Sequence, residues 1–304
     1  MHDLVILGGG PAGLAATMYA LRKGIDVMVI SPDLGGKAYQ GLSIPNTEGH
    51  RVLKPQAIVQ DYVNQLSYLP HAHTSARATA LTYEQERCHV ETRGADGSTA
   101  LVDARYVLIA TGVNPRALGV PGEREFAGRG LGYSSISYSH LLKDRRVFLI
   151  GDSRRTVADA RELAAQAREV LLFFRSSGRY HDVHLRELSA VRNVRLIDGD
   201  RIVSFQGEKF AHAVVVADAD GVKSTYEADA FFVQLQPAAN SFMVEGIVDV
   251  DDDGRIVVDM RNRTTAPGIF AAGDVTNVGF EQILVALGEG TKAALAVYEE
   301  LTRP

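Results

Sequence analysis

Residues 3–31 read DLVILGGGPAGLAATMYALRKGIDVMVIS, and this stretch decides the fold class. The short apolar run Leu4–Leu7 is typical of a buried parallel strand. Positions 11–23 carry apolar and small residues at helical spacing, and residues 26–31 form a second apolar run. We therefore predict a strand, a glycine turn, a helix and a strand in that order. This is the βαβ unit of a doubly wound parallel sheet.

The turn of this unit carries Gly8, Gly10 and Gly13 in the pattern G-x-G-x-x-G. In a dinucleotide site one such glycine permits the tight turn, one lets the backbone approach a pyrophosphate, and one lets helix and strand pack closely. The phosphates would then lie at the N-terminus of the helix, among its free N–H groups. We predict a dinucleotide site here; the alternative is a glycine-rich turn without a ligand. The acidic residue expected after the second strand is missing, because Ser31 occupies its place.

Residues 145–175 repeat this arrangement about 140 residues later. We predict a strand over 147–150, a helix over about 154–168 and a strand over 170–174. The spacing indicates two domains, each with a doubly wound core.

The glycine turn of this second unit is altered, since only Gly151 remains of the motif. Asp152 places a Cβ and a negative charge where a pyrophosphate would approach, and that repulsion would weaken binding. Arg154 and Arg155 either offset the charge or are solvated helix residues. We expect ordinary NAD(P)H binding to be lost or weakened at this turn.

The last third contains GIFAAGD over residues 268–274, followed by a segment rich in Ala and Leu. We predict a strand that ends at Gly273 and Asp274, and a helix from about residue 281 to residue 301. An aspartate at the carboxyl end of a strand is placed to accept hydrogen bonds from a polyol, because ligands gather at that edge of the sheet. The alternative is that Asp274 caps the helix.

Composition restricts the class of protein. The chain has 304 residues, of which 46% are apolar and 23% charged, with a net charge of −5. These values are ordinary for a soluble globular protein and argue against nucleic acid as a partner. No apolar run reaches the length of a membrane span, and the N-terminus enters a strand without a signal-peptide pattern. We expect a cytoplasmic protein without nucleic-acid or membrane partners.

Cysteine and histidine give little support to metal or disulfide chemistry. Cys88 is the single cysteine, so the chain cannot form an intrachain disulfide; its strand pattern, like that of an exposed hairpin, indicates a structural role. His181 and His184 lack other ligand types nearby, so we predict no metal site. Residues 249–254, DVDDDG, fall short of a calcium loop and predict a hairpin turn.

Five stretches occur in the same order as in the thioredoxin reductase-like flavoproteins, and the chain resembles that family over essentially its whole length. They are residues 8–16, 34–49, 107–123, 268–275 and 281–295. The resemblance implies an α/β fold with two Rossmann-like, three-layer ββα domains, the second inserted in the first. Residues 1–115 and 240–304 would form a discontinuous FAD-binding domain, and residues 116–239 an NAD(P)H-binding-like domain. Members of the family are usually homodimers.

The resemblance also implies which residues hold FAD. The glycine turn would bind the pyrophosphate, Asp274 the ribityl chain, and residues 282–283 would place backbone near the isoalloxazine ring. The full set is Gly8, Gly10, Pro11, Ala12, Gly13, Gly35, Gly36, Asn46, Thr111, Gly112, Gly273, Asp274, Gln282 and Ile283.

This chain departs from the family in two places. Disulfide-reducing members carry C-x-x-C before the second glycine unit, and Ser134 and Ser137 occupy those positions here. A hydroxyl cannot form a disulfide, so we predict that the protein is not a thioredoxin-disulfide reductase. In the second unit the glycine motif is broken, Arg175 and Arg179 do not form a tight basic pair, and Leu-Gln replaces the usual Ile-Gly before Pro237.

We therefore predict an FAD-dependent oxidoreductase without a catalytic dithiol, whose electrons come from a ferredoxin, a flavodoxin or a second flavin. One alternative is an enzyme similar to ferredoxin/flavodoxin–NADP reductases with a variant NADPH site. Another is a flavin-binding scaffold or sensor without catalysis. The sequence leaves open whether the second domain holds NAD(P)H, another flavin or nothing.

Overall fold

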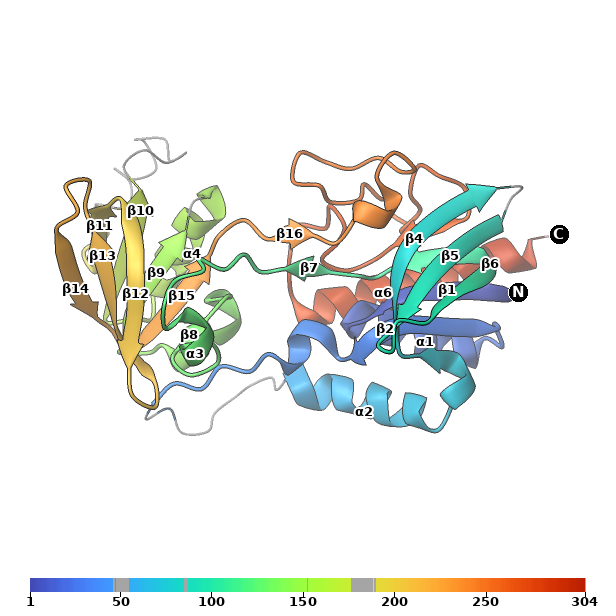
Figure 1. The fold of residues 1–304 in the computed structure, drawn as a ribbon, viewed down its shortest axis with the longest axis horizontal. Helices are drawn as coiled ribbons and strands as arrows, with labels where there is room; N and C mark the ends of the chain where they lie inside the picture. The colour runs from blue at the N-terminus through green and yellow to red at the C-terminus, as the bar shows by residue number, and fades with distance from the viewer. Residues whose placement is uncertain are drawn as a thin grey trace. The chain divides into compact units, whose positions relative to one another are not determined.

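The computed structural model describes residues 1–45, 47, 55–84, 87–151, 153–175, 188 and 190–303 (Figure 1). The chain divides into two compact units. The first comprises residues 1–40, 54–114 and 238–304, and the second comprises residues 41–53 and 115–237.

The first unit is built on a seven-stranded sheet with the order β3-β2-β1-β6-β5-β4, in which β17 also pairs with β6. Strands β1, β2, β3, β6 and β17 run parallel, whereas β4, β5 and β6 form an antiparallel meander. The strands are β1 (His2–Gly9), β2 (Val27–Leu34), β3 (His73–Thr74), β4 (Ala76–Glu84), β5 (Arg87–Gly94), β6 (Thr99–Ile109) and β17 (Ile269–Ala271).

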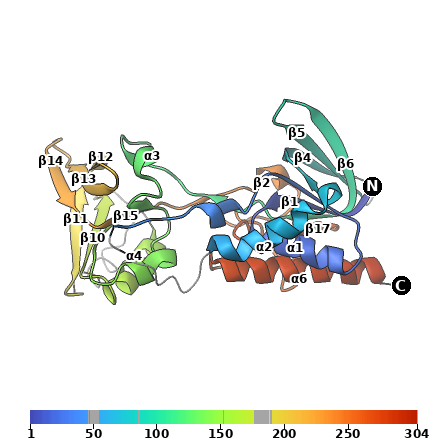
Figure 2. The same ribbon diagram turned by 90° about the horizontal axis from the view of Figure 1, so that it is seen from below.

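Helices α1 (Pro11–Arg22) and α6 (Ile283–Thr302) cover one face of this sheet, on the same side as α2 (Pro55–Ser67) in Figure 2. Strand residues such as Leu4 and Ile6 pack against the alanines of α1 and α6, and their neighbours Val5 and Leu7 pack on the opposite face. On that opposite face, Val5 and Leu7 of β1 share a core with apolar residues of β4 and β5, although these strands belong to the same sheet, and with residues 244–256. The alternation of strand side chains therefore produces three layers. Short 3-10 helices complete the unit: η1 (Gly36–Tyr39), η2 (Pro70–Ala72) and η4 (Phe242–Val244).

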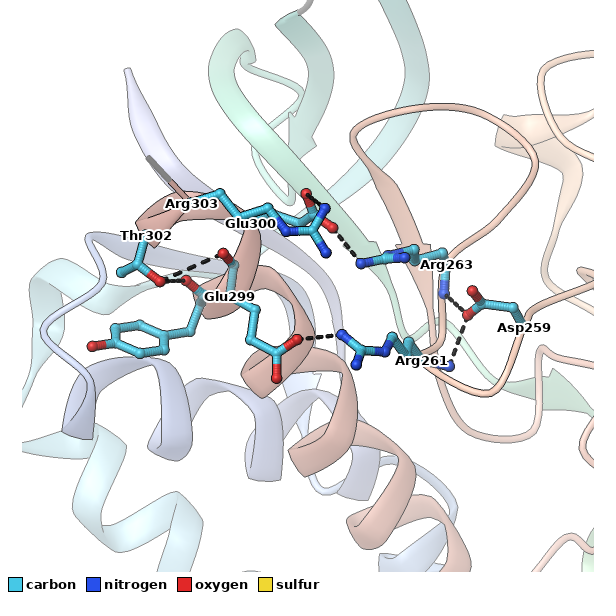
Figure 3. Close-up of polar contacts among 8 residues, drawn as sticks. Asp259, Arg261, Arg263, Glu299, Glu300, Thr302 and Arg303 are labelled. Atoms are coloured by element: carbon cyan, nitrogen blue, oxygen red, sulfur yellow. Dashed lines mark hydrogen bonds and ion pairs between the residues drawn. The ribbon is translucent and has the colours of Figure 1, made fainter.

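Helix α6 is joined to the loop before β17 by ion pairs near its C-terminus (Figure 3). Arg261 pairs with Glu299, and Arg263 pairs with Glu300. Asp259 accepts hydrogen bonds from the backbone N–H groups of both arginines, so it fixes the loop that presents them.

The second unit contains a parallel sheet with the order β11-β10-β9-β15-β8 and an antiparallel sheet with the order β12-β13-β14. Helix α4 packs on one face of the parallel sheet through Val157, Ala160 and Leu163. The elements are α3 (Glu123–Phe126), β8 (Leu131–Gly132), η3 (Ile136–Leu141), β9 (Arg146–Gly151), α4 (Arg154–Ala164), β10 (Glu169–Arg175), β11 (Val194–Gly199), β12 (Arg201–Gly207), β13 (Ala211–Ala217), β14 (Lys223–Glu227) and β15 (Ala230–Gln234).

Two short strands of the first unit, β7 (Val113–Asn114) and β16 (Ala238–Ala239), pair with each other where the chain leaves and re-enters that unit. The described part of residues 41–53 packs in the second unit, although the prediction placed it in the first. Leu42 and Ile44 are buried in the core of the second unit, and the backbone of Ser43 bonds to that of Gly128 and Gly130. Burial of these two apolar side chains explains why the segment belongs there.

The structure confirms the predicted α/β class and the two strand–turn–helix–strand units. The second strand of the first unit is longer than predicted, because β2 continues to Leu34. Helix α4 ends at Ala164, before the predicted position near residue 168. The strand of Cys88 is not an exposed hairpin strand: β5 lies between β4 and β6, and Cys88 is fully buried. No helix in the described ranges is long and apolar enough to cross a membrane.

Candidate functional site

The glycine turn between β1 and α1 is shaped by close backbone approaches. A Cβ on Gly8 would lie 2.3 Å from the carbonyl oxygen of Ala110, and a Cβ on Gly13 would lie 1.9 Å from the carbonyl oxygen of Gly8. Gly8 also has φ of +111°, a conformation that favours glycine. Side chains are therefore excluded at both positions by the packing of the turn itself.

Gly10 differs from these two glycines, because no other described residue packs where its side chain would be. A Cβ on Gly10 would meet no other described residue within 4 Å. Gly10 is the N-cap residue of α1 and provides no side-chain cap, and Pro11 and Ala12 begin the helix. The N-terminus of α1 thus presents open space beside uncapped N–H groups, which is the arrangement that binds phosphate.

The turn after β2 packs directly against this glycine turn. The N–H of Gly35 donates to the carbonyl of Gly9 at 2.7 Å, and a Cβ on Gly36 would lie 3.2 Å from the Cα of Gly10. Gly35 and Gly36 both have positive φ. At the position where a ribose-binding carboxylate was expected, Ser31 is buried and donates its hydroxyl to the carbonyl of Asp33.

Thr111 and Gly112 follow the end of β6 at the same edge of the sheet, directly after Ala110. The Thr111 hydroxyl donates to the carbonyl of Asn240 at 2.7 Å, and the Asn240 side chain donates back to the carbonyl of Thr111 at 2.9 Å. The N–H of Asn240 also donates to Gly112. These bonds hold the chain in place where it leaves the first unit. The Thr111 hydroxyl therefore has a structural role, as a donor to a backbone carbonyl.

Gly273 and Asp274 follow β17 and reach the same edge. A Cβ on Gly273 would lie 3.0 Å from the Cβ of Ala12, so the turn rests on the start of α1. The Asp274 carboxylate pairs with Lys37 at 2.6 Å. Helix α6 begins only at Ile283, with Gln282 as its N-cap residue. The alternative that Asp274 caps this helix is therefore wrong.

The start of α6 also lies without a side-chain cap, as at α1. Ile283 packs against the core between α1 and α2, around Leu14 and Met18. Two turns later, a Cβ on Gly290 would lie 1.9 Å from the carbonyl oxygen of Ala12. This close approach fixes α6 against α1 and so determines where residues 282–283 lie.

The structure brings most of the predicted residues to the carboxyl edge of the first sheet. Asn46 lies outside the described residues. Three charged residues at this edge were not predicted from the sequence: Lys37, Arg255 and Glu281. Lys37 and Glu281 could have been found from the sequence, because they are next to the predicted site residues Gly36 and Gln282. Nothing in the sequence connects Arg255 to them.

In the described part of the corresponding turn of the second unit, side chains occupy the start of the helix. Ser153 is the N-cap residue of α4, and its hydroxyl accepts from the N–H of Thr156. The Thr156 side chain fills the space beside Gly151 and donates to the carbonyl of Gln234. One backbone donor that would face a phosphate in an open turn is thus occupied. Asp152, Arg179, His181 and His184 and the side chain of Arg175 lie outside what the structure describes.

The two predicted cysteine positions are adjacent in the structure. The hydroxyl oxygens of Ser134 and Ser137 lie 2.8 Å apart and share a hydrogen bond. Between them Ser135 is fully buried and donates to Gln234, whose amide donates to Asp159 at 2.7 Å. The backbone that would place two reactive side chains together is therefore present, with hydroxyls in place of thiols.

Burial controls the titration of two groups. Desolvation raises the pKa of Cys88 to about 12, which leaves a protonated, unreactive thiol. Burial and the neighbouring Glu123 carboxylate raise the pKa of Tyr133 to about 12. Glu123 itself accepts from the N–H groups of Leu118 and Gly119, so it fixes the loop before α3. Among the described residues no cluster of His, Cys, Asp and Glu is suited to a metal ion.

The family model for pyridine nucleotide-disulphide oxidoreductases matches residues 2–290. The chain belongs to this family. A relative from Pseudomonas putida, named as a component of alkyl hydroperoxide reductase, is 34% identical over 99% of this chain and 58% of its own length. A relative from Bacillus subtilis named NADH dehydrogenase is 28% identical over 99% of this chain and 59% of its own length. The chain thus spans less than two thirds of these relatives.

Solved structures support the same assignment. Thioredoxin reductase from Streptococcus pyogenes superposes with a TM-score of 0.88 at 27% identity, covering 99% of this chain and 98% of the other. The resemblance to thioredoxin reductase-like flavoproteins is therefore confirmed in fold and family. The protein has the fold of flavoprotein oxidoreductases, and the family implies FAD as its cofactor.

Proposed function

We propose that the first unit binds FAD at the carboxyl edge of its sheet and that the chain is an FAD-dependent oxidoreductase. The observation that carries this proposal is the open N-terminus of α1. Gly10 leaves room where a Cβ would intrude, and the helix has no side-chain cap. These features suit a pyrophosphate.

The chain's own residues would hold the cofactor by position and hydrogen bonding. The backbone from Gly8 to Gly13 would receive the pyrophosphate, and Asp274 would accept a hydrogen bond from a ribityl hydroxyl. The N–H of Gln282 donates to the carbonyl of Phe280, so the uncapped start of α6 would offer the N–H of Ile283 to the isoalloxazine ring. Bound FAD supplies the electron-transfer chemistry, and the protein sets its orientation and electrostatics.

We propose further that the chain has no dithiol step. Ser134 and Ser137 occupy the two positions that such a step would need, and their hydroxyls bond to each other. The single cysteine, Cys88, is buried in the sheet of the first unit and its pKa is raised to about 12. The flavin would then be the sole redox centre of this chain.

For the electron donor we propose a ferredoxin, a flavodoxin or a second flavin in place of NAD(P)H. The support comes from comparing two helix N-termini in one chain. The N-terminus of α1 has open space at Gly10. The N-terminus of α4 is capped by Ser153, and the side chain of Thr156 fills the space beside Gly151. A nucleotide phosphate would have to displace these contacts to bind as in an open glycine turn.

A second candidate is reduction by NADH or NADPH through the variant turn. The family description and the name of the Bacillus subtilis relative favour this candidate. In that case the second unit must bind pyridine nucleotide although Ser153 caps its helix.

The cofactor content of the purified chain tests the proposal. We expect a single FAD per chain, and we expect reductive titration with dithionite to consume two electrons per chain. A chain that purifies without flavin and does not bind added FAD would contradict the proposed function. A second flavin per chain would identify the second unit as a flavin site.

A further inference from the structure

Four charged side chains of the first unit form a network beside the proposed FAD site. Lys37 contacts Asp274 at 2.6 Å and Glu281 at 3.3 Å. Arg255 contacts Glu281 at 2.8 Å and also donates to the backbone carbonyl of Asp274 at 2.8 Å. The network joins Lys37 in the turn after β2, Arg255 in the loop before β17, and Asp274 and Glu281 between β17 and α6.

The network is largely shielded from water. The side chains of Asp274, Glu281 and Arg255 are between 11% and 14% exposed, and that of Lys37 is 37% exposed. Removal of the Lys37 ammonium would leave the shielded Asp274 carboxylate without a side-chain cation among the described residues, and an uncompensated charge in such surroundings is costly.

The pairing uses only one oxygen of Asp274. Lys37 contacts Oδ2, while Oδ1 accepts no hydrogen bond from any described residue. The ion pair restrains the carboxylate through one oxygen, and its second oxygen remains available as an acceptor.

We propose that Lys37 is a positioning residue for FAD: its ammonium holds Asp274 in place, so that Oδ1 is presented to a ribityl hydroxyl. This inference rests on the proposed function, because it assumes FAD at this edge of the sheet. It predicts that Lys37 acts on the flavin half of FAD and not on the ADP half, which the glycine turn would hold.

Lys37→Met tests the proposal, with Lys37→Arg as the conservative variant and Lys292→Met as the matched control. Lys292 pairs with Glu289 at 3.1 Å in the same unit, is similarly exposed at 43%, and takes no part in the proposed site. Each holo-protein is diluted, and release of FAD is followed by its fluorescence to obtain the dissociation constant. ADP affinity is measured by competition with FAD.

We expect Lys37→Met to weaken FAD binding about tenfold, since Asp274 loses the ion pair that holds its carboxylate. ADP affinity should stay unchanged, Lys37→Arg should restore most of the FAD affinity, and Lys292→Met should behave as the wild type.

Unchanged FAD affinity in Lys37→Met would overturn the inference while leaving the proposed function intact. An equal loss of ADP and FAD affinity would overturn it as well, because it would indicate a general disturbance of the fold. A wild-type chain that does not bind FAD would instead contradict the proposed function, on which the inference depends.

Discussion

At the scale of single residues, the glycines of the first turn have two different tasks. Gly8 and Gly13 are required by backbone contacts inside the protein, where a Cβ would come within 2.3 Å of a carbonyl oxygen. Gly10 faces open space and has no such contact. We propose that its lack of a side chain serves the ligand and not the fold, and substitutions can separate the two tasks.

Gly13→Ala should destabilise the protein by about 3 kcal/mol, because the backbone of Gly8 must move to admit the methyl group. Gly10→Ala should change the free energy of unfolding by no more than about 1 kcal/mol but weaken FAD binding severalfold. Urea unfolding of the flavin-free chains and FAD titration measure both effects. Wild-type FAD affinity in Gly10→Ala would contradict the assignment of Gly10 to the ligand.

Cys88 gives a prediction about pH. Burial raises the pKa of the folded thiol from 9.0 to about 12, so the unfolded chain loses its proton first as the pH rises. The stability contributed by the neutral thiol is complete below pH 9.0 and is lost as the pH approaches 12. At about pH 10.5 we expect the wild type to have lost about 1–2 kcal/mol more than Cys88→Ala, relative to pH 8. Equal pH profiles for the two chains in urea unfolding would show that the thiol is not desolvated.

At the scale of elements, the helices of the two glycine units differ at their N-termini and α6 is held at its C-terminal end. Helix α1 is uncapped, and α4 is capped by Ser153. Helix α6 is tied to the loop before β17 by two ion pairs of different exposure (Figure 3). The side chains of Arg261 and Glu299 are 52% and 54% exposed, and those of Arg263 and Glu300 are 32% and 21% exposed.

This difference in exposure predicts a difference in stability. Arg263→Ala should lower the free energy of unfolding by about 1–2 kcal/mol, because it leaves the shielded Glu300 with only Arg303. Arg261→Ala should cost less than about 0.5 kcal/mol, since its pair is screened by water. The two variants serve as controls for each other in urea unfolding. An equal cost would indicate that exposure does not decide the strength of these pairs.

The same scale shows how far the sequence predicts the structure. Periodicity and turn residues indicated β1, α1, β2, β9 and β10, because each depends on a local pattern of apolar residues. The packing of Leu42 and Ile44 in the second unit was not predicted, since it depends on a core cluster whose other members, such as Leu142 and Val147, lie about 100 residues away.

The candidate site shows the same limit. The glycines could be predicted because their motif is local. The network of Lys37, Arg255, Asp274 and Glu281 could not, because four separate positions come together only when β2, β17 and α6 meet at one edge of the sheet.

At the scale of the whole molecule, the chain contains two units of dinucleotide-binding type, and the helix N-termini that could bind a nucleotide differ between them. The first unit has an open helix N-terminus beside a shielded charge network, and the second has a capped helix N-terminus beside two hydrogen-bonded serines. Family membership implies FAD for the chain, and these contrasts suggest that the first unit holds it. The central claim is that electrons reach this flavin from a donor other than NAD(P)H.

Anaerobic reduction of the holo-protein tests this claim most directly. The visible absorbance of the bound flavin is followed after mixing with NADH, NADPH, reduced ferredoxin or reduced flavodoxin, each at micromolar concentration. Our account predicts that one of the reduced proteins bleaches the flavin rapidly and that neither nucleotide does. Rapid bleaching by NADH or NADPH would contradict it and would establish the variant turn at Ser153 as a working nucleotide site.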